Sequence, residues 1–243
     1  MKLHEYQRAV QKLSLELAPD RRELPAFQLY REMIQSRFSS MARVAFRRSW
    51  ALLGEHRCAQ SFARYLATEG PSSPILREVI ERYGAFAVRD RELLQGAPDA
   101  AADLLRFEAT TWRISSDDAQ LPPSLSLREV DFEGVLVLNP TLTMLALEYD
   151  VSESALATMP RDPHTLLLYR RRAEDDVRWY RAPRVLSELL ALEGGSERSL
   201  AELVRSLFER SHPGSAEELL EELASALTVA VERGVVWGVR DPA

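Results

Sequence analysis

The feature that most constrains the fold is a pair of short apolar and polar alternations separated by a charged turn. Leu166 and Leu168 form the first alternation, and Val177 and Trp179 form the second. Residues 173–175, Ala-Glu-Asp, lie between them. This pattern is typical of a half-buried β-hairpin. Because an isolated hairpin cannot hide its apolar face from water, the neighbouring segments must cover it.

Three helical segments follow the hairpin and can supply that cover; they are expected at residues 183–193, 199–209 and 215–233. Pro183 suits the first turn of a helix, where its missing N–H costs nothing, and Gly194 suits a helix stop. Ser199 and Ser215 each stand where an N-cap hydroxyl is needed, and Ser199 has Glu202 at capping-box spacing. A hairpin with three helices makes a winged-helix-like unit, which can bind nucleic acid or receive a peptide as an extra strand.

Other short strands are expected around this unit. Residues 133–149 alternate apolar and polar side chains on both sides of Asn139-Pro140, which predicts two strands with a tight connection. Residues 152–163 are expected to form a loop, and residues 235–239, VVWGV, a short strand.

The N-terminal part predicts an α-helical bundle. Apolar residues recur at helical spacing in six segments: residues 3–17, a segment from near Pro25, two that meet near Gly54, residues 75–86, and a last one that carries Trp112. A polar stretch with a double proline, residues 115–126, marks a boundary. The expected class is α+β, with a helical bundle over residues 1–118, a linker over 119–128, and a winged-helix-like domain with a small antiparallel sheet and three helices over 129–243.

The distribution of charge disfavours nucleic acid as a ligand. The formal net charge is −6. Residues 1–120 carry 18 basic and 16 acidic side chains, a balance of +2, whereas residues 121–243 carry 13 and 21, a balance of −8. A DNA-binding domain needs its basic surface where its reading helix lies, and here the winged-helix-like part is the acidic part.

Composition disfavours several other classes. The single cysteine, Cys58, excludes an internal disulfide, and no apolar run reaches the roughly 20 residues that cross a bilayer, so a cytoplasmic protein is expected. A metal pair of His56 and Cys58 is disfavoured, because residues two apart on a helix point away from each other. The chain has no glycine-rich phosphate loop, no paired carboxylates at catalytic spacing and no Ser or Cys beside a suitable base. We therefore expect no catalytic residue, metal ligand or cofactor.

Basic residues gather in the predicted bundle, in a stretch poor in acids. Arg43, Arg47 and Arg48, with Trp50 among them, could form a docking surface for an acidic partner. The solvated side of two helices explains the same pattern equally well. A similar choice concerns residues 170–172, three arginines at the end of the first hairpin strand. Because acids follow directly, solvated turn charges are favoured there over phosphate contacts.

Two further positions carry alternatives. Trp179 and Tyr180 face opposite sides of the second hairpin strand. Trp179 shares its parity with Val177 and is expected in the core, which leaves Tyr180 for a bound peptide or for an ordinary surface role. Glu108 lies among apolar residues of a predicted helix, so it is either a buried acid with a raised pKa or the partner of an arginine in the bundle.

The first half of the chain resembles a known family. The resemblance covers most of residues 26–114 and is carried by Tyr30-Arg31, Phe46, Leu52-Leu53-Gly54, Phe62, Tyr65-Leu66, Gly70-Pro71-Ser72-Ser73-Pro74 and residues 102–109, ADLLRFEA. This pattern is similar to the helical domain, with an old DNA-binding label, of the partner subunits of multinuclear non-haem iron-dependent oxidases, of which the methanobactin biosynthesis partner is the best-known type. Arg47 stands where many members have proline, and Ala109-Thr110 replaces the usual aromatic residue.

The second half is similar to the precursor-recognition elements of ribosomal peptide natural-product (RiPP) pathways. The resemblance implies that a leader peptide pairs as an added strand and packs against the third helix. The implied peptide-binding residues are Val177, Arg178, Trp179, Tyr180, Leu219, Leu223 and Leu227. The three leucines are equally candidates for the core.

Together the two resemblances imply a non-catalytic accessory subunit. It would form a heterodimer with a TIM-barrel multinuclear iron oxidase, whose iron is held by that enzyme, and would present a precursor peptide for oxidative modification. The alternative is a DNA-binding transcriptional regulator of winged-helix type, which depends on the order of hairpin and helices, the arginines of the bundle and the old family label. Several phosphate contacts would give such a regulator a steep loss of affinity with salt.

Overall fold

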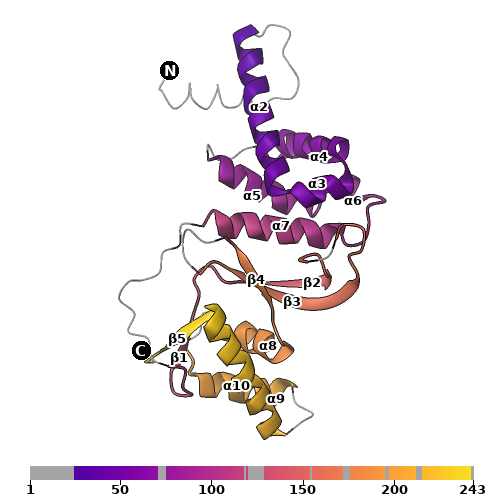
Figure 1. The fold of residues 1–243 in the computed structure, drawn as a ribbon. Coiled ribbons are helices and arrows are strands. Elements are labelled where there is room, and N and C mark those ends of the chain that lie inside the picture. The colour runs from indigo at the N-terminus through magenta and orange to yellow at the C-terminus, as the bar shows by residue number, and fades with distance from the viewer. Residues whose placement is uncertain are drawn as a thin grey trace, which may run out of the picture. The chain divides into compact units, whose positions relative to one another are not determined.

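The structure, a computed structural model, describes residues 25–70, 75–117, 119, 129–153, 155–171, 176–194, 197–211 and 215–241. The helix predicted over residues 3–17, and all of the predicted linker except Ala119, lie outside the described residues. Within them, nine helices and five strands form a mixed α+β protein, as predicted (Figure 1). The chain divides into two compact units: unit 1 is Met1–Arg113 with Tyr149–Arg161, and unit 2 is Ile114–Glu148 with Asp162–Ala243.

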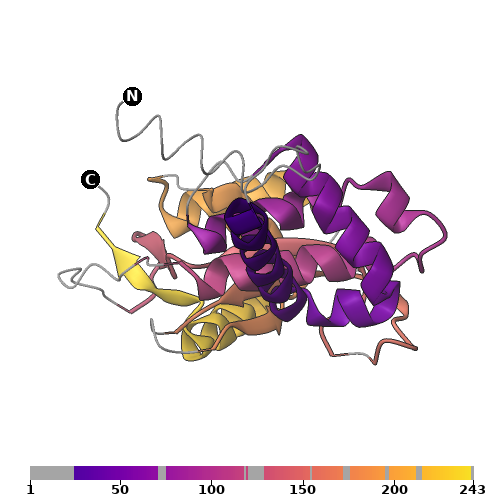
Figure 2. The ribbon, with the colours of Figure 1, turned by 90° about the horizontal axis from the view of Figure 1, so that it is seen from above.

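The described helices before residue 116 are α2 (Pro25–Ala45), α3 (Arg47–Leu53), α4 (Glu55–Thr68), α5 (Leu76–Ala87), α6 (Arg91–Leu94) and α7 (Ala101–Ser115). Figure 2 views α2 almost along its axis. The predicted start near Pro25 and the meeting of two helices at Gly54 are confirmed. Gly54 has a φ of +89°, and its N–H donates to the carbonyl of Trp50 at 3.0 Å, so it ends α3 and lets α4 begin in a new direction.

An aromatic cluster forms the centre of unit 1. The ring of Tyr83 meets the rings of Phe46 and Phe62 edge to face, with centroids 5.3 and 4.8 Å apart. Gly84 allows α5 to approach closely: a Cβ at this position would lie 2.7 Å from the Cβ of Ala109 and 3.0 Å from Phe46. A glycine is therefore required where α5 packs in this core.

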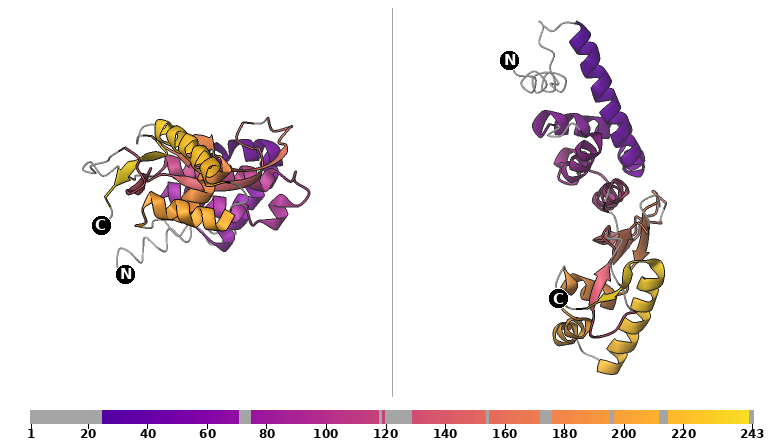
Figure 3. Two further views of the ribbon diagram at one scale, coloured as in Figure 1. Left: turned by 90° about the horizontal axis from the view of Figure 1, so that it is seen from below. Right: turned by 90° about the vertical axis from the view of Figure 1, so that its left-hand side faces the viewer.

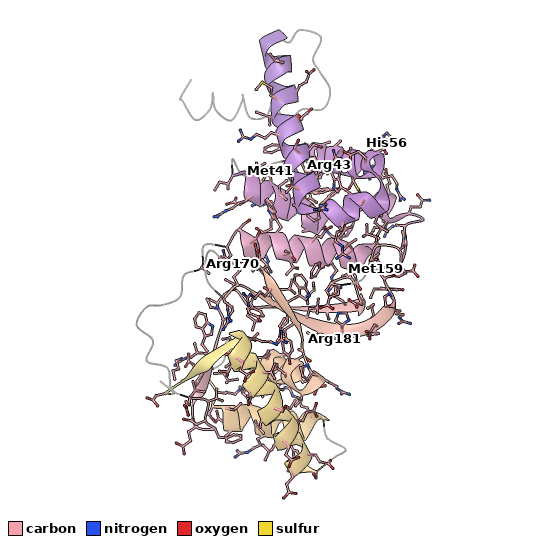
Figure 4. The ribbon with its side chains drawn as sticks, in the orientation of Figure 1. Met41, Arg43, His56, Met159, Arg170 and Arg181 are labelled. Carbon is pink, nitrogen blue, oxygen red and sulfur yellow. The ribbon has the colours of Figure 1, made fainter. Side chains whose placement is uncertain are left out.

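The connection between two strands, Tyr149–Arg161, belongs to unit 1; Met159 marks it in Figure 4. Two contacts join it to the helices of this unit: Asp103 Oδ2 accepts the N–H of Tyr149 at 3.0 Å, and the guanidinium of Arg48 donates to the carbonyl of Val151. The chain therefore passes between the two units three times.

The described strands are β1 (Val135–Leu138), β2 (Thr143–Tyr149), β3 (Arg161–Tyr169), β4 (Arg178–Arg181) and β5 (Val236–Arg240). They form a sheet of β1 and β5 and a sheet in the order β2-β3-β4. The predicted hairpin is confirmed, because β3 and β4 pair antiparallel with Leu167 opposite Tyr180. Its predicted turn, residues 173–175, and Arg172 lie outside the described residues. The predicted loop over 152–163 extends too far, since β3 begins at Arg161.

The two strands predicted over residues 133–149 are present, but they do not pair with each other. β1 pairs antiparallel with β5, about a hundred residues further along the chain, and β2 joins β3. The turn at Asn139 separates them, because its side chain bonds to the carbonyls of Arg170 and Gly234 and so directs β1 and β2 into different sheets.

Unit 2 also contains α8 (Arg184–Glu193), α9 (Leu200–Ser211) and α10 (Ala216–Arg233), as expected. The predicted capping box of Ser199 and Glu202 is confirmed, and Ser215 with Glu218 forms a second one, which has the same spacing. The right-hand view of Figure 3 shows α10 along its length beside β1 and β5. The core of unit 2 lies among these helices and the strands, with fully buried leucines that include Leu167, Leu186, Leu189, Leu203 and Leu207.

Candidate functional site

The outer edge of β4 is the first part of the candidate site. β4 ends the strand order β2-β3-β4, and no strand in the described part of the chain pairs with its second edge. Arg178, Trp179 and Arg181 are exposed, Tyr180 is half-buried, and Val177 is half-buried just before the strand. Figure 4 labels Arg181 on this strand, where it also makes two 2.7 Å ion-pair contacts with Asp162.

The hydrogen-bond pattern identifies which backbone groups face the open edge. The N–H of Ala182 donates to the carbonyl of Thr165 at 3.0 Å, so these two opposite residues form a hydrogen-bonded pair. Such pairs alternate along an antiparallel ladder. Tyr180 therefore bonds towards β3, whereas the N–H and C=O groups of Trp179 and Arg181 point away from β3.

The prediction that Trp179 is the core member of this strand is wrong. Its side chain is 37% exposed, and Tyr180 instead packs against the core of unit 2. The reason lies in β3, where Leu166, Leu167 and Leu168 are all buried. Because both faces of β3 are covered, the alternation does not reveal which face meets the helices.

Tyr180 links β4 to the end of α10. The guanidinium of Arg233 lies over the ring of Tyr180, 4.6 Å from its centroid, which is a cation–π contact. Burial raises the pKa of the Tyr180 hydroxyl, and the charge of Arg233 opposes that rise. Next to this contact, the guanidinium of Arg171 donates to the carbonyl of Glu232 at 3.2 Å. The inner face of β4 is therefore held by α10, and no described strand pairs with its outer edge.

The α10 leucines in the predicted peptide-binding set all belong to the core. Leu219, Leu223 and Leu227 are buried in the cluster formed with α8, α9 and the strands. Leu223 and Leu227 also line a cavity of about 760 Å³ on one side of α10, together with residues of β5 and residues 129–132. The structure thus places the β4 residues and the leucine-lined cavity at different surfaces of unit 2.

Arg170 contradicts the prediction of a solvated turn charge. It is 7% exposed, its N–H donates to Thr141 Oγ1 at 2.9 Å, and its guanidinium donates to the carbonyl of Asp117. Of the arginines described in residues 170–172, Arg170 is buried and Arg171 is exposed. Arg170 follows the last residue of β3, and its carbonyl accepts a hydrogen bond from the side chain of Asn139. The sequence pattern contains no sign of these contacts.

The residues predicted to dock a partner do not share one surface. Arg43 is exposed, lies 3.4 Å from Glu55 as an ion pair and is labelled in Figure 4, and Arg47 is exposed. Trp50 is buried in the core of unit 1, and Arg48 is half-buried. Within this set, Arg43 and Arg47 are the side chains that a partner can reach.

Glu108 is the buried acid, one of the two alternatives for this residue. Its carboxylate accepts the N–H groups of Arg48 and Ser49 at 2.7 and 2.9 Å and the Ser49 hydroxyl at 2.6 Å. These donors lie at the start of α3, where backbone N–H groups lack helical partners. Desolvation by burial raises the pKa of Glu108, against the opposing effect of these hydrogen bonds. The carboxylate therefore anchors α7 to the first turn of α3.

His56 and Cys58, the pair considered for a metal ion, differ in their exposure to solvent. His56 is exposed, whereas Cys58 is buried, and burial raises the pKa of its thiol to about 12. A protonated buried thiol is a poor ligand. In the parts of the chain that the structure describes, no three side chains of His, Cys, Asp or Glu gather in a way that could hold a metal ion. None of the described helices has the length and apolar character of a bilayer span.

Comparison with known proteins adds no family. No protein-family model matches the chain, and no curated protein matches it significantly in sequence. The resemblance to the partner subunits of iron-dependent oxidases therefore stays a prediction.

Proposed function

We propose that this protein is a non-catalytic partner subunit that binds a ribosomally made precursor peptide and presents it to a TIM-barrel multinuclear iron oxidase. In this proposal unit 2 is a winged-helix-like recognition domain, with the β3-β4 hairpin followed by α8, α9 and α10. The iron and the catalytic residues belong to the partner enzyme.

The observation that carries the proposal is the outer edge of β4. The backbone groups of Trp179 and Arg181 point to this edge, and an extended peptide can pair with them as an additional antiparallel or parallel strand. Trp179 is exposed enough to contact such a peptide, while Tyr180, Arg233 and the core hold the opposite face in place. A preformed strand lowers the entropy cost of binding.

Docking of the enzyme is proposed at unit 1, through the exposed Arg43 and Arg47. Two exposed arginines suit an acidic partner. Arg43 already forms an ion pair with Glu55, so Arg47 is the better position for a test. Charge reversal of Arg47 is expected to weaken co-purification with the enzyme.

The experiment measures binding of the full chain to a fluorescent precursor peptide encoded beside its gene, with a random DNA duplex as the parallel ligand. Trp179→Pro removes one outward N–H without removing a bond to β3, since proline is tolerated on edge strands. Trp179→Val loses the same ring but keeps the N–H, so it is the matched control.

We expect the peptide to bind, Trp179→Pro to weaken binding by about tenfold or more, and Trp179→Val to retain most of it. Absence of peptide binding, or equal effects of the two variants, would contradict strand addition. DNA binding with a steep salt dependence and no response to peptide would favour the winged-helix regulator instead.

A further inference from the structure

A second surface of unit 2, separate from the edge of β4, has the form of a binding groove. The cavity of about 760 Å³ is bounded by one side of α10, by Trp237 and Gly238 of β5, and by residues 129–132, which precede β1. All of these residues belong to unit 2. We call this surface the α10 groove.

The groove has an apolar floor and apolar walls that reach the solvent. Leu223 and Leu227 lie at its floor and are buried. At its sides, Phe132 is 53% exposed, Leu220 39% and Val231 40%. Residues 220, 227 and 231 recur at helical spacing, so they lie along one side of α10. Exposed apolar side chains gathered around a cavity mark an interaction surface.

The charged residues that the structure describes along the groove are acidic. Among the described residues, its lining includes the carboxylates of Glu129, Asp131 and Glu232 and no Lys, Arg or His. Asp131 Oδ1 accepts the N–H groups of Glu133 and Gly134 at 3.0 and 2.7 Å, which fixes this carboxylate beside the groove. An apolar surface with acids at its border is complementary to a ligand that is apolar on one side and basic at its flanks.

We propose that the α10 groove binds a basic, amphipathic peptide segment. The lining residues of α10 run from Leu220 to Glu232, which corresponds to about 18 Å along the helix axis. A helix of about twelve residues has this length, and its apolar side chains at positions three and four apart can lie on the floor. Lysine or arginine side chains of the segment then face Glu129, Asp131 and Glu232.

The groove and the edge of β4 lie on different sides of α10. Each residue advances the helix by about 100°, so Arg233, which contacts Tyr180, projects almost opposite to Ala224 in the groove. A peptide can therefore occupy one surface without touching the other. The identification of the ligand as a peptide rests on the proposed function, whereas its basic character follows from the groove.

The test uses the full chain and a labelled synthetic peptide of about twelve residues with leucine and lysine at helical spacing. Its twin carries glutamate in place of every lysine. We expect the lysine peptide to bind and the glutamate twin to bind at least about tenfold more weakly. Ala224→Arg, which puts a charged side chain at the groove, and Glu232→Lys, which reverses one border charge, are each expected to weaken the lysine peptide by a similar factor.

Glu222→Lys is the matched control, because Glu222 is exposed on the side of α10 away from Ala224. This variant changes the net charge as Glu232→Lys does, and is expected to leave binding within about twofold. Equal weakening by the two lysine variants would overturn the proposal, because it would indicate attraction to the whole acidic unit. Equal binding of the two peptides would overturn it as well, and so would a dimer of the chain that Ala224→Arg converts to monomer.

Failure of the groove and failure of the proposed function give different results. If Trp179→Pro weakens the precursor peptide but Ala224→Arg leaves the lysine peptide unchanged, the groove proposal fails and strand addition at β4 stands. If Ala224→Arg releases the lysine peptide while the precursor peptide does not bind at all, the groove stands and the proposed function fails.

Discussion

Asn139 joins three separated parts of unit 2 through one buried side chain. Its amide nitrogen donates to the carbonyls of Arg170 and Gly234 at 2.7 and 3.0 Å, and its oxygen accepts the N–H and the hydroxyl of Thr141 at 3.0 and 2.8 Å. Arg170 follows β3 and Gly234 ends α10, so the residue fixes the turn after β1 to both elements. A buried polar group that loses its partner keeps the full cost of desolvation.

Asn139→Ala is therefore expected to lower the free energy of unfolding by about 3 kcal/mol, because it removes four hydrogen bonds and leaves their partners buried. Thr141→Ala removes the Thr141 hydroxyl contacts to Asn139 and Arg170 and is expected to cost about half as much. Urea denaturation followed by circular dichroism measures both. A loss below about 1 kcal/mol for Asn139→Ala would contradict the role of this residue.

Glu108 predicts a pH dependence in unit 1. Its pKa is raised in the folded chain, so the folded state binds the proton more tightly than the unfolded state does. The resulting stabilisation is complete below the ordinary glutamate pKa, about 4.5, and is lost as the pH rises through the raised folded pKa. The free energy of unfolding of the native chain is therefore expected to decrease over this pH range. That of the Glu108→Gln variant is expected to show no such decrease.

The measurement for Glu108 is urea denaturation of both proteins at several values between pH 4.5 and neutrality. Ser49→Ala, which removes one hydrogen bond to the carboxylate but leaves the group ionisable, is the control and should keep the pH dependence. Parallel stability curves for the native chain and Glu108→Gln would exclude a raised pKa at this residue.

Two residues show what the sequence pattern could not predict: the core face of the hairpin at Trp179 and the burial of Arg170. Leu166 and Leu168 predicted the hairpin correctly, because alternation identifies a strand. It could not identify the core face, since Leu167 is buried too and Trp179 consequently faces outward. Arg170 followed three leucines and a tyrosine with no turn signal, so only the folded chain shows that its carbonyl and N–H are bound by Asn139 and Thr141.

At the scale of elements, local signals were reliable and distant pairings were not. Capping residues and glycines predicted α8, α9 and α10 because these signals act within one helical turn. The pairing of β1 with β5 joins residues about a hundred positions apart, and a local periodic pattern does not reveal which strands pair. Helix α6 is a single turn of four residues capped by Asp90, which is too short to show helical periodicity. The α10 groove likewise depends on residues 129–132 meeting α10, which periodicity does not predict.

The N-terminus of α10 gives a prediction at this scale. Ser215 accepts the N–H of Glu218, and Glu218 in turn accepts the N–H of Ser215, at 3.2 and 3.3 Å. Ser215→Ala is expected to lower the free energy of unfolding by about 1 kcal/mol, because it leaves a helix N–H without its cap. Ser225→Ala, at an exposed position inside the same helix, should cost nothing, since alanine favours helix. Thermal or urea unfolding compares the two, and equal losses would contradict the cap.

At the scale of the whole molecule, the two halves of the sequence differ in charge, with balances of +2 and −8. In the proposed function, unit 2 binds the peptide, and it contains most of the acidic half of the chain. Unit 1 carries the exposed arginines that are proposed to bind the enzyme. In the proposed function the oxidation chemistry belongs to the partner enzyme.

Residue-resolved amide hydrogen exchange can detect whether a peptide adds as a strand to β4. In the free chain the amide of Tyr180 should be protected by β3, whereas the amides of Trp179 and Arg181 point away from β3. Saturation with the precursor peptide is predicted to slow exchange at Trp179 or Arg181, or at both, while Tyr180 changes little. Unchanged exchange at both positions with the peptide fully bound would contradict the account, because the peptide would then occupy a different surface.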